Sequence, residues 1–129
     1  MTSSKTLILI TTSPHSHKAK LALQDAQSRL AKGEHIAVFF YGDGAYTANR
    51  LMWQTADVPS IATEWVNLAQ SHNLSLPVCV STALARGITD AENAKRHSLD
   101  GDNLLVPFTL VGLSELALLI DDETAVVQY

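Results

Sequence analysis

Apolar and polar residues alternate along the chain with two different periods. Lys5 to Thr11 is a β-branched and leucine-rich run that stops before Ser13-Pro14, which is typical of a buried strand. Between Lys18 and Lys32 the apolar residues recur at steps of four, three and four, which places them on one face of a helix. Gly33 follows and can end this helix in the left-handed conformation. Ile36 to Tyr41 is apolar throughout and predicts a strand covered on both faces.

The rest of the chain continues this alternation. Gly42-Asp43-Gly44 predicts a loop, and Ala45 to Leu51 predicts a short helix. The later predicted elements are, in order, a helix through Ile61, Trp65, Leu68 and His72, a strand from Leu76 to Val80, a short helix capped by Ser81 and Thr82 and stopped by Gly87, a helix and loop within 89–103, a helix from Gly112 to Ile120, and a strand from Ala125 to Gln128. This order predicts one α/β domain over residues 1–129, with a mainly parallel sheet and helices on both faces.

Candidate chemistry is expected where the strands end, because reactive groups of parallel α/β sheets gather at the carboxyl ends of the strands. Those ends lie near residues 11–16, 41–46 and 79–82. The third segment contains Cys79, the only cysteine of the chain. A thiol at the start of a helix faces the positive end of the backbone dipole, which would lower its pKa below the usual value of about 8.5 and favour the thiolate. Arg86 is the nearest cation in sequence and can add to this field.

The same cysteine has a simpler interpretation. Between Val78 and Val80, a free cysteine is also a common small apolar core residue. The two interpretations differ in accessibility, because a transfer role requires a thiol that is reachable and ionised at neutral pH. The local sequence leaves both open.

Composition narrows the classes of function. Apolar residues make up 47% and charged residues 17% of the 129 residues, and the formal net charge is -4. These values predict a globular protein and argue against direct binding of nucleic acid, which requires a basic surface. Residues 1–5 are polar, and the apolar run Leu7 to Ile10 is too short for a signal sequence or a membrane span. With one cysteine no internal disulfide can form, so we expect a soluble cytoplasmic protein.

Two loops carry weaker signals. His15 and His17 could serve as metal ligands or as proton donors near the thiol, but no second Cys or His pair completes a zinc ligand set, so we expect no metal. Gly42-Asp43-Gly44 lacks both the full GxGxxG pattern and the Walker lysine, which leaves a small nucleotide-binding module as a weak alternative. We expect this turn to expose Tyr46 and Asn49 beside Cys79 or at a partner surface.

Two tryptophans and an acidic turn complete the candidates. Trp65 lies on a helical apolar stripe and is expected in the core, whereas Trp53 lies in a loop-like segment and is expected to anchor an interface. Asp121-Asp122-Glu123 predicts a solvated turn.

Three blocks of the sequence together carry a resemblance to a known family. They are residues 38–49 (Val-Phe-Phe-Tyr-Gly-Asp-Gly-Ala-Tyr-Thr-Ala-Asn), residues 78–87 (Val-Cys-Val-Ser-Thr-Ala-Leu-Ala-Arg-Gly), and residues 108–117 (Phe-Thr-Leu-Val-Gly-Leu-Ser-Glu-Leu-Ala) with Asp121-Asp122 and 126–129 behind them. In order and spacing they resemble the DsrE/DsrF superfamily of small sulfur-relay proteins over nearly the full chain, with Cys79 in register with the family's active cysteine. Relatives often carry a glycine-rich turn after the first strand, where this chain has residues 13–17 (Ser-Pro-His-Ser-His), so we expect a differently shaped loop there.

The resemblance implies both a fold and a function. The implied fold is a flavodoxin-like three-layer sandwich, and the implied activity is that of a sulfurtransferase. Cys79 would accept sulfur as a persulfide from a donor protein and pass it to an acceptor protein, without a metal or organic cofactor. The member that the chain most resembles works in 2-thiolation of the tRNA wobble uridine, within a hetero-hexamer of related small subunits, which implies such partners here. A relay in oxidative sulfur metabolism and a non-catalytic scaffold subunit remain alternatives.

Overall fold

The computed structural model describes residues 4–129 of the chain. Residues 1–3, on which part of the expectation about targeting segments rests, lie outside the described residues. Within the described range the elements follow in the order β1 (Lys5–Ile10), α1 (His17–Ala31), β2 (His35–Phe40), the 3-10 helix η1 (Gly42–Ala48), α2 (Ile61–His72), β3 (Leu76–Cys79), α3 (Val80–Ala85), α4 (Ala91–Arg96), β4 (Phe108–Val111), α5 (Leu113–Leu119) and β5 (Thr124–Gln128).

The strands form one parallel sheet in the order β4-β3-β2-β1-β5. β1 lies between β2 and β5, with Ile8 opposite Val38 on one side and Val127 on the other. β3 lies between β2 and β4, with Leu76 opposite Phe108. The α/β class and the parallel sheet predicted from the sequence are confirmed. One edge of the sheet is β4, a four-residue strand that was not predicted from the sequence.

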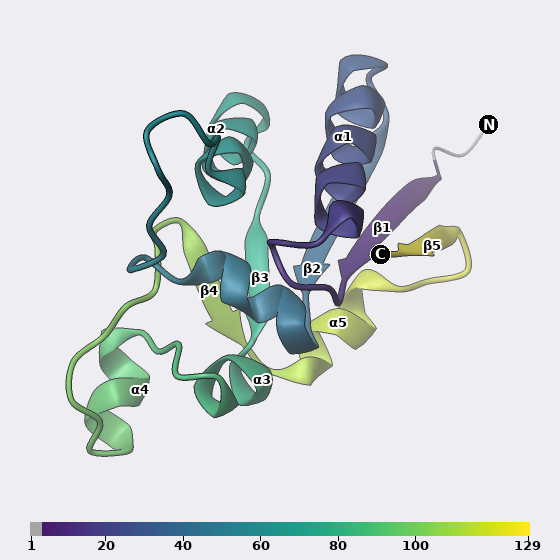
Figure 1. Cartoon of the computed structure of the whole chain (residues 1–129). Coiled ribbons are helices and arrows are strands. Elements are labelled where there is room, and N and C mark those ends of the chain that lie inside the picture. Colours follow the sequence, from purple (N-terminus) through teal and green to yellow (C-terminus); the bar gives the residue numbers. More distant parts are fainter. Residues whose placement is uncertain (1–3) are drawn as a thin grey trace.

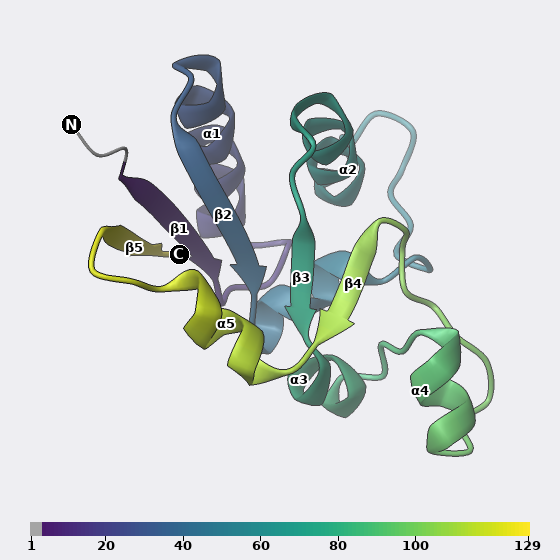
Figure 2. The ribbon, with the colours of Figure 1, turned by 180° about the vertical axis from the view of Figure 1, so that it is seen from behind.

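Helices cover the two faces of the sheet unequally. α1, α2 and η1 lie over the face that is at the front in Figure 1, and their buried side chains form the main core with that face. Figure 2 shows the opposite side, where α5 lies across the sheet at the end where the strands finish. The expected helices on both faces are therefore present, but the second layer is a short helix of seven residues.

Both long helices begin and end at residues that the sequence favours for these positions. The Ser16 hydroxyl accepts a backbone hydrogen bond at the start of α1, and Gly33 follows its end with a left-handed φ of 79°. α2 begins in the same way at Ser60 and ends at Asn73, which has a φ of 53°. Within residues 4–129 none of the helices combines the length and the apolar character required to cross a membrane.

The main core is centred on Phe40 at the end of β2. Its ring packs edge-on against Trp65 of α2, with ring centroids 5.5 Å apart, and against Phe108 of β4 at 5.2 Å. All three side chains are almost fully buried, so the core position predicted for Trp65 is confirmed. Edge-on aromatic pairs contribute about 0.5–1.5 kcal/mol beyond their buried area. Because Phe108 belongs to β4, the strand that the sequence did not predict is part of this core.

The segment after β2 differs from its prediction. In place of a loop followed by a helix from Ala45, a 3-10 helix runs from Gly42 to Ala48. Its backbone passes directly against the end of β1, where the Tyr41 N–H donates a hydrogen bond to the Ile10 carbonyl at 2.9 Å. Gly44 lies against the same carbonyl and leaves no room for a side chain. The glycine therefore permits a contact between backbones that a larger residue would prevent.

Tyr129 follows β5 and connects this edge of the sheet to the end of β1 and to α1. Its backbone N–H donates to the carbonyl of Leu9, and its carbonyl accepts hydrogen bonds from the N–H and the hydroxyl of Thr11. The phenol donates a hydrogen bond of 2.7 Å to the carboxylate of Asp25 in α1, which also pairs with Arg29 at 2.9 Å. The pKa of the Tyr129 phenol is raised by its burial and by this hydrogen bond.

Gly44→Ala tests the close approach of η1 to β1. A Cβ atom at position 44 would overlap the carbonyl oxygen of Ile10 and lie 2.9 Å from its carbon. We expect the free energy of unfolding, measured in urea, to fall by about 2–4 kcal/mol. Gly112→Ala is the matched control, because a Cβ there meets only ordinary contacts, and it should change stability by less than about 1 kcal/mol. Equal effects of the two substitutions would contradict the packing described for η1.

Tyr129→Phe tests the hydrogen bond to Asp25. Removing the hydroxyl should lower the free energy of unfolding by about 1–2 kcal/mol near neutral pH. Because the folded-state pKa of Tyr129 is raised, this contribution should be complete below pH of about 10 and be lost as the pH rises through the raised value. Urea unfolding across this pH range measures the difference. Tyr41→Phe is the control, at a tyrosine that is 37% exposed, and should cost less than about 0.5 kcal/mol.

Candidate functional site

Cys79 ends β3 and is the N-cap residue of α3, so its predicted place between a strand and a helix is confirmed. Side chains alternate between the two faces along a strand. Val78 belongs to the main core on the side of α1 and α2. Cys79 joins a second, smaller apolar cluster with Leu7 and Phe39 on the side of α5. The thiol is free.

The side chain of Cys79 is not open to solvent in this structure. The residue is only 3% exposed, whereas a transfer role requires a thiol that another protein can reach. The thiol is buried because it lies beneath α5. Leu116 and Leu119 of that helix pack against the cluster that contains Cys79. The sequence left the exposure of this thiol open. In this conformation it is closed, and a reaction of Cys79 with another protein requires a movement.

Thr82 connects Cys79 to the neighbouring strand end. Ser81 and Thr82 were predicted to cap α3, but both lie inside the helix, which begins at Val80 with Cys79 as its N-cap residue. The Thr82 hydroxyl donates a hydrogen bond to the Cys79 carbonyl and accepts one from the Gly42 N–H, each at 3.2 Å. The carboxyl ends of β2 and β3 are thereby held together, as their places in the predicted sheet suggested.

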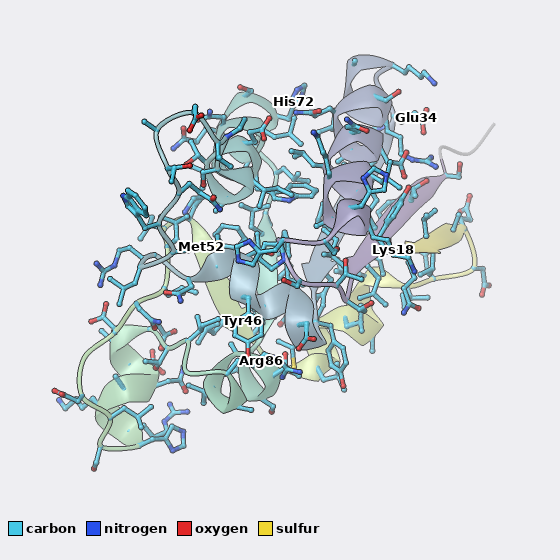
Figure 3. The ribbon with its side chains drawn as sticks, viewed as in Figure 1. Lys18, Glu34, Tyr46, Met52, His72 and Arg86 are labelled. Carbon is cyan, nitrogen blue, oxygen red and sulfur yellow. The ribbon has the colours of Figure 1, made fainter. Side chains whose placement is uncertain are left out.

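Arg86 and Tyr46 form the polar part of this sheet end. The Arg86 guanidinium donates hydrogen bonds to the Asp43 carboxylate at 2.9 Å and to the Thr82 carbonyl at 3.1 Å. It also lies 5.9 Å from the centre of the Tyr46 ring, and Figure 3 shows these two side chains next to each other. Arg86 was expected to strengthen the positive field at the thiol. It forms an ion pair with Asp43, whose opposite charge acts against such a field, and its effect on the thiol stays a prediction.

His15 and His17 lie at a different place from Cys79. They line a surface cavity of about 530 Å³ between the starts of α1 and α2, together with Lys20 and Glu64. Cys79 is not among the lining residues of this cavity. Within residues 4–129 no three His, Cys, Asp or Glu side chains gather in a metal-binding arrangement. The structure therefore does not place these histidines as proton donors for the thiol.

The remaining candidates lie in connecting segments. Trp53 is 81% exposed between η1 and α2, and its predicted role as an interface anchor stays a prediction. Tyr46 is 39% exposed, as expected. Asn49, in contrast, has a structural role, because its side-chain oxygen accepts a hydrogen bond from Asn103 at 3.0 Å and holds that distant loop in place.

The acidic turn lies between α5 and β5 and is exposed, as predicted. The carboxylate of Asp121 accepts hydrogen bonds from the Glu123 N–H at 2.8 Å and from the Thr124 hydroxyl at 2.9 Å. These two bonds, with a smaller effect of the Lys5 charge, lower the pKa of Asp121. The turn at the end of α5 is therefore held by hydrogen bonds among its own residues.

Two features of the site were missed from the sequence. The bridging role of Thr82 depends on Gly42, forty residues away in the chain, and no local pattern marks it. The cover formed by Leu116 and Leu119 had one available signal, because residues three apart share a face of a helix. That spacing identifies an apolar face of α5, but it does not say that the face lies on Cys79.

Comparison with known proteins places this arrangement among its relatives. The model of the DsrE/DsrF-like family matches residues 4–129. The chain is 40% identical over 115 residues to a protein named sulfurtransferase TusD from Proteus mirabilis, covering 87% of this chain and 88% of that protein. It is 44% identical over 101 residues to the protein of the same name from Pectobacterium carotovorum, covering 78% of each.

The fold has a solved counterpart. The crystal structure of the ychN protein from E. coli superimposes with a TM-score of 0.69, covering 98% of this chain and 100% of that one, at 14% sequence identity. At this identity the likeness concerns the fold alone. The family match over nearly the whole chain and the 40–44% identity to curated relatives show that the protein belongs to the DsrE/DsrF-like family.

Proposed function

We propose that this protein is a sulfurtransferase that carries sulfur as a persulfide on Cys79. The observation that supports this most strongly is the similarity, at 40–44% identity over most of the chain, to proteins named sulfurtransferase TusD. Sulfur transfer between proteins requires a cysteine thiolate, and Cys79 is the only cysteine of this chain. Its place at the end of a parallel strand, where such folds collect their reactive groups, agrees with this role.

The proposed reaction is a displacement at sulfur. The Cys79 thiolate attacks the outer sulfur of a persulfide on the donor protein, and a new S–S bond forms to Cys79 as the S–S bond of the donor breaks. The electron pair of the broken bond leaves on the inner sulfur, so the donor departs as a thiolate. An acceptor thiolate then attacks the outer sulfur on Cys79 in the same way, and the Cys79 thiolate is regenerated. Neither step changes the total oxidation state, so no redox partner, metal or organic cofactor is required.

The pathway we propose is the relay for 2-thiolation of the tRNA wobble uridine in the cytoplasm, with related small subunits as partners in a hetero-hexamer. A net charge of -4 disfavours direct contact with RNA, so the donor and the acceptor are expected to be proteins. A relay in oxidative sulfur metabolism uses the same chemistry and stays an alternative for the pathway, which the identity of the donor and acceptor would decide.

The burial of Cys79 favours a second candidate function. A cysteine that is 3% exposed within an apolar cluster is what a non-catalytic scaffold subunit would contain, since a free cysteine is often a small core residue. The two candidates differ in whether sulfur ever reaches this thiol. A scaffold subunit would never carry sulfur, and a carrier would do so whenever a donor is supplied.

Loading with sulfur distinguishes the two candidates. The purified protein is incubated with a cysteine desulfurase and free cysteine, and its intact mass is measured without reducing agent. We expect a gain of one sulfur atom, which cyanide or dithiothreitol removes. Cys79→Ser should gain none. Its free energy of unfolding should fall by about 1–3 kcal/mol, because the hydroxyl is buried in an apolar cluster, and circular dichroism checks that the variant is folded when it is tested.

A matched positive control uses a TusD relative under the same conditions. If that protein gains sulfur while this chain stays at its starting mass, with and without an added relay partner, the carrier function is refuted and the scaffold subunit is the better description.

A further inference from the structure

The cover over Cys79 comes from one short helix. Cys79 shares its cluster with Leu7 and Phe39, and Val111 packs against them from the neighbouring strand. All of these belong to the sheet. Among the described residues, the members of this cluster that lie outside the sheet are Leu116 and Leu119, both from α5. The access of any other protein to the thiol is therefore decided by the position of α5.

α5 is weakly held. It has seven residues, none of them buried, and no side chain caps its start at Gly112. Helices of this length are not stable on their own in water, so α5 depends on its contacts with the sheet. Those contacts are made by half-buried leucines, whereas Leu118 on the same helix is 78% exposed. Segments with few buried apolar groups open at a smaller free-energy cost than the core.

The strands beneath α5 cannot move aside to expose the thiol as easily as α5 can. β3 is paired on both sides, with β2 and with β4, so moving Cys79 itself would break the sheet. Beyond Leu119 the same face is already hollow, with a cavity of about 240 Å³ to which Ala37 and Pro77 contribute. Figure 2 shows that the space on the outer side of α5 is free of other elements. The helix can lift without displacing another part of the described chain.

We propose that α5 is a movable cover of Cys79, and that the thiol reacts only in conformers in which Leu116 and Leu119 have left the sheet. Displacement at sulfur requires the attacking and the attacked atoms to come into contact, which a residue that is 3% exposed does not allow. This inference deepens the proposed function, on which its biological meaning rests. Opening of the cover can nevertheless be measured without any sulfur donor.

The test is the rate at which dithionitrobenzoate labels Cys79 in the native protein. Leu116→Ala and Leu119→Ala weaken the closed state and should each raise the labelling rate about tenfold. Leu118→Ala is the matched control, because it makes the same change on the exposed side of the same helix. It should change the rate by less than about twofold. Labelling of the parent protein should depend only weakly on low urea concentrations, because lifting α5 exposes little surface.

A fourth variant, Gly112→Ala, should act in the opposite direction. Gly112 joins β4 to α5 with φ and ψ of -73° and 161°, which alanine also adopts, and an added Cβ would meet only the Ser114 hydroxyl at 3.6 Å. Gly112→Ala restricts the open state more than the closed one, so labelling should slow by about two- to fivefold.

Two results would contradict the proposal that α5 covers Cys79. One is equal labelling rates for Leu116→Ala and Leu118→Ala. The other is a parent rate whose urea dependence equals that of global unfolding, since the thiol would then react only in the unfolded chain. Failure of the proposed function is distinguishable from both. If the labelling rate depends on α5 but the protein never gains sulfur, the proposed sulfur-carrier function is refuted, whereas the proposal that α5 covers Cys79 is supported.

Discussion

The structure depends on the alternation of side chains along β3. Consecutive residues of a strand point to opposite faces of the sheet, so Val78 and Cys79 meet different surroundings although they are neighbours in sequence. Val78 enters the main core with Phe40 and Trp65. Cys79 enters the thin layer under α5. A shift of β3 by one residue would exchange these places and bury the thiol beneath α1 and α2.

The same end of the sheet is fixed by contacts between backbones. The approach of Gly44 to the Ile10 carbonyl brings η1 against the end of β1, and Thr82 joins the start of η1 to the end of β3. Arg86 then pairs with Asp43 across the same gap. These contacts hold the backbone of Cys79 in place, so the freedom that a reaction needs has to come from the layer above the side chain.

The sequence predicted the parts of the fold that depend on local patterns. The long helices show clear apolar stripes and polar caps, and β1 and β2 are continuous apolar runs. It did not predict β4, because a four-residue strand at a sheet edge is defined by its pairing with β3, which brings Leu76 opposite Phe108. The continuous 3-10 helix from Gly42 depends on a contact with β1 that no local pattern contains.

The candidate site likewise has features that could be predicted from local sequence and features that could not. The place of Cys79 between a strand and a helix follows from local sequence, and so does the absence of any other thiol. Its burial does not, because the leucines that cover it lie about forty residues further along the chain and reach it only once β4 has joined β3. The ion pair of Arg86 could not be predicted for a related reason, since its partner Asp43 is equally distant in sequence.

The two faces of the sheet differ in the free energy needed to uncover them. Exposing Val78 would require α2 to separate from the sheet, which would pull Trp65 of α2 away from Phe40. Both are among the largest buried side chains, and such a loss is close to unfolding the protein. Exposing Cys79 requires two half-buried leucines to leave the sheet. A thiol that is to be protected from water and from other reactants, and still be available to a partner, can therefore lie on the face covered by α5. The face covered by α1 and α2 would not allow this. The residue that follows Val78 has this position because strands alternate, and the low cost of opening follows from the shortness of α5.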